Sequence, residues 1–384
     1  MAMTRRETLR LLGCSAAAFP LATPMTFAAV PGDSRLVVVV LRGALDGLDA
    51  LRPVGDPGLA RLRPGIAAGD GVALTGFHAL HPGLAALEPL WRAGELGFAQ
   101  AVATPYRDKR SHFDGQDVLE SGTAGLPAGQ RGWMNRMLEG LADTGVPVDA
   151  RTALAVGRDE MLILRGPARH ASWAPDEDLG VDGATADLLR HVHHDDPLFR
   201  QALDDALGFS TDGRGRGGRQ TPEERLFGFA ATQLRRDARI AALSVGGWDT
   251  HRAQPRRLRQ GLARLAGGLL KLRDDLGRAW DRTTVLMITE FGRTAAENGT
   301  MGTDHGTGGT MILAGGALRG GRVWGAWPGL DEADLLDRRD LMPLRDVRAY
   351  AGWAMRDAFG LDRALIERAV FPGLEMGDDP RLLG

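Results

Sequence analysis

Cysteine is almost absent from this 384-residue sequence, in which Cys14 is the only one. It lies inside an N-terminal segment with the features of an export signal. Without that segment the chain has no means of forming a disulfide bond, a thiolate metal site or a cysteine nucleophile. Any metal ion must then be bound by oxygen and nitrogen ligands.

The sequence also lacks a charge excess and a membrane-spanning run. Its 47 basic and 49 acidic residues give a formal net charge of −2, so no global basic field indicates nucleic-acid binding. No stretch approaches the ~18 uninterrupted apolar residues of a membrane span. The hydrophobic share of 43% and the charged share of 25% exclude wholesale disorder and rod-like folds.

The N-terminal segment predicts export. Arg5 and Arg6 precede an apolar stretch at 11–22, and small residues ending at Ala28 offer a cleavage site. Adjacent arginines before an apolar stretch resemble a twin-arginine signal. We therefore predict that residues 1–28 are a signal peptide read by the twin-arginine export machinery, and that the protein is periplasmic or otherwise exported. The alternative is an ordinary disordered N-terminus with chance arginines.

Apolar runs that alternate with helical patterns predict an α/β fold. Strand patterns lie at 36–41, 96–102, 161–164, 240–245, 284–289 and 310–314. Helical patterns lie at 82–93, 112–120, 221–239, 256–276 and 346–359. Continuous apolar strands are typical of a parallel sheet buried on both faces. We predict one domain over residues 29–384, with a mostly parallel central sheet, helices on both faces, and an irregular, flexible inserted lobe near 176–220.

Acidic residues follow the three strongest strand patterns. Asp46 follows the first, Asp249 the second and Glu290 the third. In an open parallel sheet, ligands bind beyond the carboxyl ends of the strands. Three carboxylates gathered there would repel one another and raise their pKa values unless a cation lay among them. A divalent metal ion is the simplest resolution.

Histidines arrive at the same place. His251 follows Asp249 by two residues, and His305 with Asp304 lies just before another strand pattern. Carboxylate and imidazole ligands without sulfur suit Zn, Mn, Fe or Ca. We predict a divalent ion with candidate ligands Asp46, Asp249, His251, Glu290, Asp304 and His305.

Each candidate ligand also has a structural interpretation. Asp46 would stabilise a glycine-rich turn, Asp249 would cap the following segment, and Glu290 would pair with Arg293. His305 would be a hydrogen-bonded loop histidine. Because all of these residues are predicted to lie at one edge of the sheet, the metal site is favoured over the separate structural interpretations.

A nucleophile candidate follows a different strand pattern. Ser111 stands at the predicted start of a helix, three residues before Asp114, which is typical of an N-cap. A hydroxyl there meets the partial positive charge and free N–H groups of the helix, and metal coordination would activate it further. The alternative is that Ser111 only caps the helix. His112 and Arg293 complete the catalytic candidates, and His112 is also a possible substitute ligand.

A second group of histidines is predicted not to be the site. His191, His193 and His194 lie in the polar inserted segment, where no buried strand fixes their geometry.

The motifs around these residues resemble the bacterial domain of unknown function 1501 family. They are the twin-arginine start, LRGALDGLD at 41–49, RSHFDGQD at 110–117, GWDTH at 247–251, TEFGRT at 289–294 and GTDHG at 302–306. That family looks like a remote branch of the alkaline phosphatase and sulfatase superfamily, which has an α/β fold, a hydroxyl nucleophile and one or two metal ions.

The resemblance implies roles for individual residues. Asp46 matches the first-strand metal aspartate, Ser111 the nucleophile, and His305 a late histidine ligand. Asp249 with His251 looks like the mid-chain Asp–His pair, and Glu290 stands where the superfamily has an aspartate. Phe291 replaces that aspartate's partner histidine, so a single-metal site is expected.

Three functions remain open from the sequence. The first is an exported, metal-dependent hydrolase of phosphate or sulfate esters. The second is a non-catalytic, metal-stabilised binding or scaffold protein of the cell envelope. The third is a transferase that moves a phospho-group between envelope glycans or lipids. Each implies a small-molecule, glycan or lipid partner and none implies nucleic acid.

Overall fold

A computed structural model describes residues 33–67, 71–107, 110–127, 129, 131–156, 161–173, 187–188, 191–192 and 220–384. The predicted signal peptide lies outside these residues, as does most of the predicted insertion, so both stay predictions. No helix of the described part is long and apolar enough to cross a bilayer.

A nine-stranded sheet forms the centre of the described structure, in the order β11-β5-β10-β9-β1-β8-β6-β7, with β12 paired to β5. Strand β1 lies parallel to β8 and β9, so the mostly parallel sheet predicted from the sequence is confirmed. The strands are β1 (Arg35–Arg42), β5 (Leu96–Ala103), β6 (Ala153–Val156), β7 (Ala171–Trp173), β8 (Ile240–Gly246), β9 (Thr283–Ile288), β10 (Gly309–Ala314), β11 (Val323–Trp324) and β12 (Arg345–Asp346).

Strand β10 runs antiparallel to both of its neighbours, β5 and β9. The loop that precedes β10 therefore lies at the edge where the parallel strands end. Because of this reversal, His305 arrives beside residues that follow β8 and β9. A parallel β10 would have placed His305 at the opposite edge.

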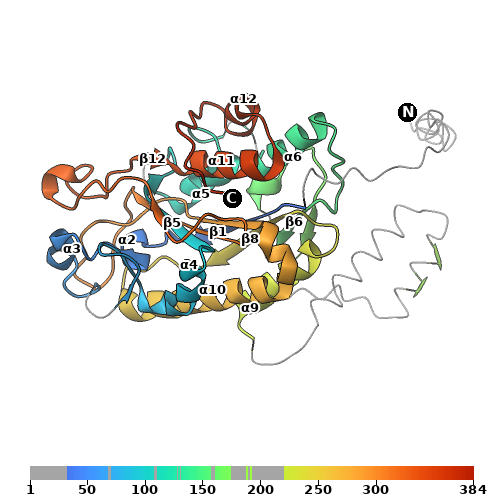
Figure 1. The fold of residues 1–384 in the computed structure, drawn as a ribbon. Helices are drawn as coiled ribbons and strands as arrows, with labels where there is room; N and C mark the ends of the chain where they lie inside the picture. Colours follow the sequence, from blue (N-terminus) through green and yellow to red (C-terminus); the bar gives the residue numbers. More distant parts are fainter. Residues whose placement is uncertain are drawn as a thin grey trace.

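Helices cover both faces of the sheet (Figure 1), as the sequence predicts. Alternate residues of β1 point to opposite faces: Val38 and Val40 join one apolar cluster, and Val37 and Val39 join the other. One face carries α5 (His112–Ser121), α6 (Trp133–Asp143), α11 (Val347–Phe359) and α12 (Arg363–Leu365). The other carries α4 (Glu88–Arg92), α9 (Pro222–Leu234) and α10 (Gln254–Leu276).

Smaller elements complete the described fold. A three-stranded sheet is formed by β2 (Leu51–Arg52), β4 (Ala79–Leu80) and β3 (Val72–Ala73), beside the short helices α2 (Gly47–Ala50) and α3 (Pro57–Leu62). Short 3₁₀ helices lie at η1 (Pro82–Leu87), η2 (Leu162–Leu164), η3 (Gly277–Arg282) and η4 (Glu332–Asp334), and a π-helical segment lies at η5 (Ile366–Val370).

Two predicted elements differ from the structure. The apolar residues 161–164 form the 3₁₀ turn η2 rather than a strand, and the strand of this region is β6 at Ala153–Val156. Helix α9 ends at Leu234 rather than near 239, because the chain must turn there to enter β8.

Candidate metal centre

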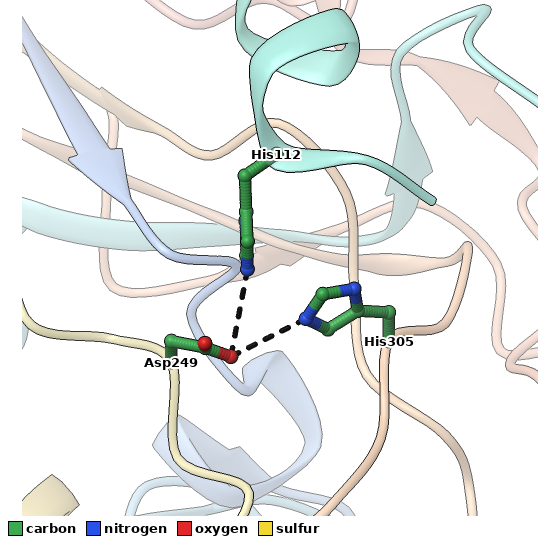
Figure 2. A group of neighbouring side chains, drawn as sticks. All are labelled: His112, Asp249 and His305. Carbon is green, nitrogen blue, oxygen red and sulfur yellow. Dashed lines mark hydrogen bonds and ion pairs between the residues drawn. The ribbon is translucent and has the colours of Figure 1, made fainter. Parts of the chain in front are cut away.

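Three side chains from separate segments gather at the carboxyl edge of the sheet. The ligand atoms of His112, Asp249 and His305 all lie within 4.8 Å of one another. Asp249 Oδ1 is 3.5 Å from His112 Nε2 and 3.3 Å from His305 Nε2. Figure 2 shows both imidazole rings pointing toward the Asp249 carboxylate. Among the described residues this is the one such group.

A third imidazole approaches the same carboxylate. His251 Nε2 is 3.1 Å from Asp249 Oδ1 and 3.0 Å from His305 Nε2. Two neutral imidazole nitrogens facing each other at this distance require a proton or a cation between them, because both otherwise present lone pairs. The predicted pair Asp249 and His251 thus meets the predicted His305 in space.

The loops that carry these side chains are held together by backbone contacts. Arg293 and His305 form an isolated antiparallel bridge between the two sides of the β9–β10 connection. Gly43, with a φ of +114°, lies against the Asp249 loop, and a Cβ at Gly43 would be 2.7 Å from the Asp249 nitrogen. Only glycine tolerates both the conformation and the contact. The Gly43 N–H also donates to Glu290 Oε1 at 2.8 Å.

The Nδ1 atom of each histidine is tied to an acceptor outside the group. His112 Nδ1 is 2.8 Å from Glu290 Oε1, His305 Nδ1 is 2.8 Å from the Arg110 carbonyl oxygen, and His251 Nδ1 is 3.3 Å from Asp304 Oδ1. Such acceptors behind histidine are typical of metal ligands, because they fix the ring and leave the Nε2 lone pair for the ion.

His112 Nε2 provides a direct test of whether the residues fit a metal ion. It is buried and makes no hydrogen bond to any described residue. Buried polar atoms in proteins are nearly always satisfied, so an orphaned imidazole nitrogen requires an explanation. Ligand atoms around a tetrahedral zinc ion lie about 3.3 Å apart, since the metal–ligand bonds are about 2.0–2.1 Å long. The distances from Asp249 Oδ1 to the three Nε2 atoms, and between the Nε2 atoms of His251 and His305, are 3.0 to 3.5 Å and fit that arrangement.

The ionisation states of Asp249 and His305 also suit metal binding. Partial burial raises the pKa of Asp249, but the hydrogen bond and charge of Arg293 outweigh it and lower that pKa to about 2. Burial lowers the pKa of His305, which favours the neutral ring. The hydrogen bond to Glu290 raises the pKa of His112. Asp249 is therefore an anion at neutral pH, and His305 is neutral.

Asp46 does not join this group, which differs from the sequence-based expectation. Its carboxylate is fully buried and accepts from Arg63 Nη1 at 2.8 and 3.0 Å, from Gln254 Nε2 at 2.8 Å and from Thr303 Oγ1 at 3.2 Å. It also caps α2 by accepting from the Asp49 N–H. Burial raises the pKa of Asp46, yet Arg63 holds it below the usual 3.8. Protein donors therefore satisfy both oxygens of this carboxylate.

Glu290 and Asp304 lie behind the histidines rather than among the ligand atoms. Glu290 is buried and contacts His112, and Asp304 contacts His251 and Asn298 Nδ2. Arg293 is also buried: it donates to Asp249 Oδ1 at 2.6 Å and to backbone carbonyl oxygens of Gly43, Ala44, Trp248 and Thr303. Its guanidinium holds loops together, so the structure gives no free face of Arg293 for a substrate.

Ser111 is the N-cap of α5, as predicted, and accepts from the Asp114 N–H at 3.4 Å. It directly precedes His112, which brings the helix N-terminus to the centre. Phe291, in contrast, was noticed in the sequence only as a missing ligand. Its buried ring stacks on His112 at 5.2 Å between centroids and lies 5.1 Å from His305, so it supports both rings.

Two other described histidines, His81 and His191, are not part of this ligand group. His191 is exposed, and His193 and His194 lie outside the described residues. His81 accepts from the Gly83 N–H and lies 4.0 Å from Asp49, so it belongs with the Asp46 surroundings.

Comparison with known proteins gives one family and several solved structures. The family described as "Protein of unknown function (DUF1501)" matches residues 215–350, which include Asp249, His251, Glu290 and His305. This match confirms the resemblance stated from the motifs. No curated protein matches.

The similar solved structures have low sequence identity. A protein in the alkaline phosphatase superfamily from Vibrio parahaemolyticus is 14% identical, covering 98% of this chain and 81% of that chain with a TM-score of 0.38. The C-terminal periplasmic domain of EcEptC from Escherichia coli is 12% identical, covering 93% and 91% with a TM-score of 0.40. The lipoteichoic acid synthase LtaP from Listeria monocytogenes is 10% identical, covering 71% and 60% with a TM-score of 0.34.

Proposed function

We propose that this protein is an exported hydrolase of phosphate or sulfate esters that depends on one divalent metal ion. The observation that carries the proposal is the convergence of three imidazole Nε2 atoms on Asp249, with the buried His112 Nε2 lacking any hydrogen bond among the described residues. Asp249, His112 and His305 would hold the ion, and His251 would complete the set.

The donor set favours particular metals. Calcium takes six to eight oxygen ligands, and one carboxylate among imidazoles supplies too few. Imidazole suits zinc and iron, and sites with open positions formed by two histidines and one carboxylate also bind iron. We therefore propose zinc, iron or manganese rather than calcium. When bound, such an ion would polarise an ester oxygen and lower the pKa of a coordinated hydroxyl or water.

The protein's own residues would bind the ester and supply the nucleophile. The N-terminus of α5 offers backbone N–H groups and the positive end of the helix dipole to an anionic ester. Ser111 Oγ would attack phosphorus or sulfur, and the bond to the ester oxygen would break as the alcohol leaves. Water would then release the phosphate or sulfate and restore the hydroxyl. His305, neutral beside Asp249, would serve as a ligand rather than a base.

Ser111 allows capping and nucleophilic attack to be separated. Asparagine is an N-cap as good as serine, but it has no hydroxyl. Ser111→Asn should keep the stability and the bound metal while release of p-nitrophenol from its phosphate or sulfate ester falls at least ~1,000-fold. Ser111→Ala should lose turnover and about 1 kcal/mol of stability as well. Turnover that survives in Ser111→Asn removes Ser111 from the mechanism and leaves it as a cap.

Two measurements on the wild-type protein separate the alternatives. Elemental analysis of the purified protein identifies the ion, and a chelator should abolish ester release until the same ion is restored. A protein that binds metal, gains thermal stability from it and never turns over an ester would be a scaffold. Transfer of the phospho-group to an added glycan acceptor, instead of to water, would indicate a transferase.

A further inference from the structure

One face of α5 carries three polar residues spaced four apart. His112, Gln116 and Glu120 follow one another at i, i+4 and i+8, so they line one side of the helix. They interleave with two residues from the carboxyl ends of strands, Arg42 at the end of β1 and Glu290 just after β9. We call these five residues the α5 ladder.

The contacts of the α5 ladder form one unbroken series. Glu120 Oε1 is 2.7 Å from Arg42 Nη2, and Arg42 Nη1 donates to Gln116 Oε1 at 2.7 Å. Gln116 Nε2 donates to Glu290 Oε1 at 3.2 Å, and Glu290 Oε1 is 2.8 Å from His112 Nδ1. Arg42 is held further by Ser244 Oγ, which accepts from its Nε at 2.8 Å.

The chemistry of each group fixes the direction of every hydrogen bond. Arginine only donates, so Gln116 must turn its carbonyl oxygen toward Arg42 and its amino group toward Glu290. Glu290 Oε1 therefore faces donors from Gln116 and from the Gly43 N–H, and it stays an acceptor. The proton between Glu290 and His112 then belongs on His112 Nδ1. The Nε2 lone pair of His112 is left free, and it faces Asp249.

We propose that Gln116 is a positioning residue for metal binding: oriented by Arg42, it fixes His112 in the Nδ1–H tautomer with Nε2 available as a ligand. This role rests on the proposed metal centre, and it concerns the orientation and tautomer of the His112 ring. Gln116 itself touches neither the ligand atoms nor any group placed in the chemistry above. Its effect passes through Glu290.

The test replaces the side-chain amino group of Gln116 with a carboxylate oxygen. Gln116→Glu has nearly the same shape and still accepts from Arg42, but its ionised carboxylate has no N–H to donate to Glu290. We expect the affinity for Zn²⁺, measured by competition with a chromophoric chelator, to fall about 10- to 100-fold. Asp117→Asn is the matched control, because Asp117 is the next residue of α5 and is exposed. The Zn²⁺ affinity of this variant should equal that of the wild type.

A second readout does not depend on metal or on turnover. The ¹⁵N shifts of His112, in metal-free protein with labelled histidine at a pH where the ring is neutral, report which ring nitrogen carries the proton. The wild type should show the Nδ1–H tautomer, and Gln116→Glu should shift toward a mixture. A fold that is intact by circular dichroism in both variants excludes general loss of structure as the cause.

The outcomes are distinct. A wild-type His112 with its proton on Nε2, or a Gln116→Glu variant with wild-type tautomer or wild-type Zn²⁺ affinity, overturns the inference. A wild-type protein that binds Zn²⁺ but releases no phosphate or sulfate overturns the proposed function and leaves this comparison of affinities valid. A wild-type protein that binds no divalent ion overturns both.

Discussion

Two polar clusters lie at the same edge of the sheet and are built on different chemistry. Around Asp46, the carboxylates of Asp46 and Asp49 are buried against the guanidinium groups of Arg63 and Arg52, at 2.8 Å in both pairs. We call this the closed cluster. Around Asp249, a side chain that is 46% exposed meets imidazole nitrogens, and one of those nitrogens has no hydrogen bond among the described residues. We call this the open cluster.

Each central carboxylate pairs with a buried arginine, Asp46 with Arg63 and Asp249 with Arg293, so the difference lies in the other partners of the two carboxylates. Arg63, Gln254 and Thr303 all donate to the Asp46 carboxylate, so the closed cluster is complete without an ion. An imidazole offers a lone pair, so the open cluster is complete only with a proton or a metal ion. Position after a strand therefore does not by itself identify a ligand. The partners of the carboxylate do.

Removing the Asp249 carboxylate should have the largest effect on the open cluster. Asp249→Ala deletes the oxygen that all three histidines face, so we expect Zn²⁺ affinity to fall more than ~1,000-fold, which is more than about 4 kcal/mol. Isothermal titration calorimetry measures it. Asp114→Ala, a carboxylate in the first turn of α5, is the control and should bind as the wild type does. Wild-type affinity in Asp249→Ala would mean that the open cluster holds no ion.

The reciprocal change belongs to the closed cluster. Asp46→Asn leaves the buried charge of Arg63 without its partner, and breaking a buried pair in this way typically costs about 3 kcal/mol or slightly more. We expect that loss in the free energy of unfolding, measured with urea, together with Zn²⁺ affinity within about twofold of the wild type. If Asp46 were a ligand, as its place after β1 suggested, the affinity would collapse instead.

The sequence was a good guide to the sheet and a partial guide to its chemistry. Runs such as 36–41 and 284–289 are long and apolar enough to identify β1 and β9. Four-residue runs are not: 153–156 is a strand and 161–164 contains a 3₁₀ turn, yet both are apolar and periodicity does not distinguish them. Length therefore decides which strands a sequence reveals.

The site was predictable where it depends on strand ends and hidden where it depends on distant partners. Asp249, His251 and His305 meet because three loops share one edge of the sheet. Nothing in the sequence indicates that Arg63, from the end of α3, reaches Asp46, or that Glu290 orients His112 from 178 positions away. Only tertiary contacts show that Asp46 pairs with Arg63 and that Glu290 supports His112.

The stability of the closed cluster should depend on pH, because His81 is buried beside it. Burial lowers the pKa of His81 to about 4, below the ordinary 6.5 that it regains on unfolding. Its contribution to stability is therefore complete above pH 6.5 and is lost as the pH falls toward 4. We expect a loss of roughly 2 kcal/mol between pH 7 and pH 5. His81→Asn keeps an acceptor for the Gly83 N–H but does not titrate. Its free energy of unfolding, measured with urea, should therefore fall by about 2 kcal/mol less than that of the wild type between pH 7 and pH 5. Equal losses in both proteins would show that His81 titrates normally.

The smallest expected effect comes from the rim of the open cluster. Asp304 Oδ1 faces His251 Nδ1 at 3.3 Å and accepts from Asn298, and its side chain is 55% exposed. Asp304→Asn removes the charge that orients His251, so the Zn²⁺ affinity should fall about tenfold. Residues that support metal ligands typically contribute about 10- to 100-fold in affinity, and we expect the lower value because water competes for exposed groups. Asp331→Asn, which breaks an exposed ion pair with Arg61, should leave the Zn²⁺ affinity unchanged. A tenfold loss places His251 among the ligands, whereas an unchanged affinity would restrict the centre to His112, Asp249 and His305.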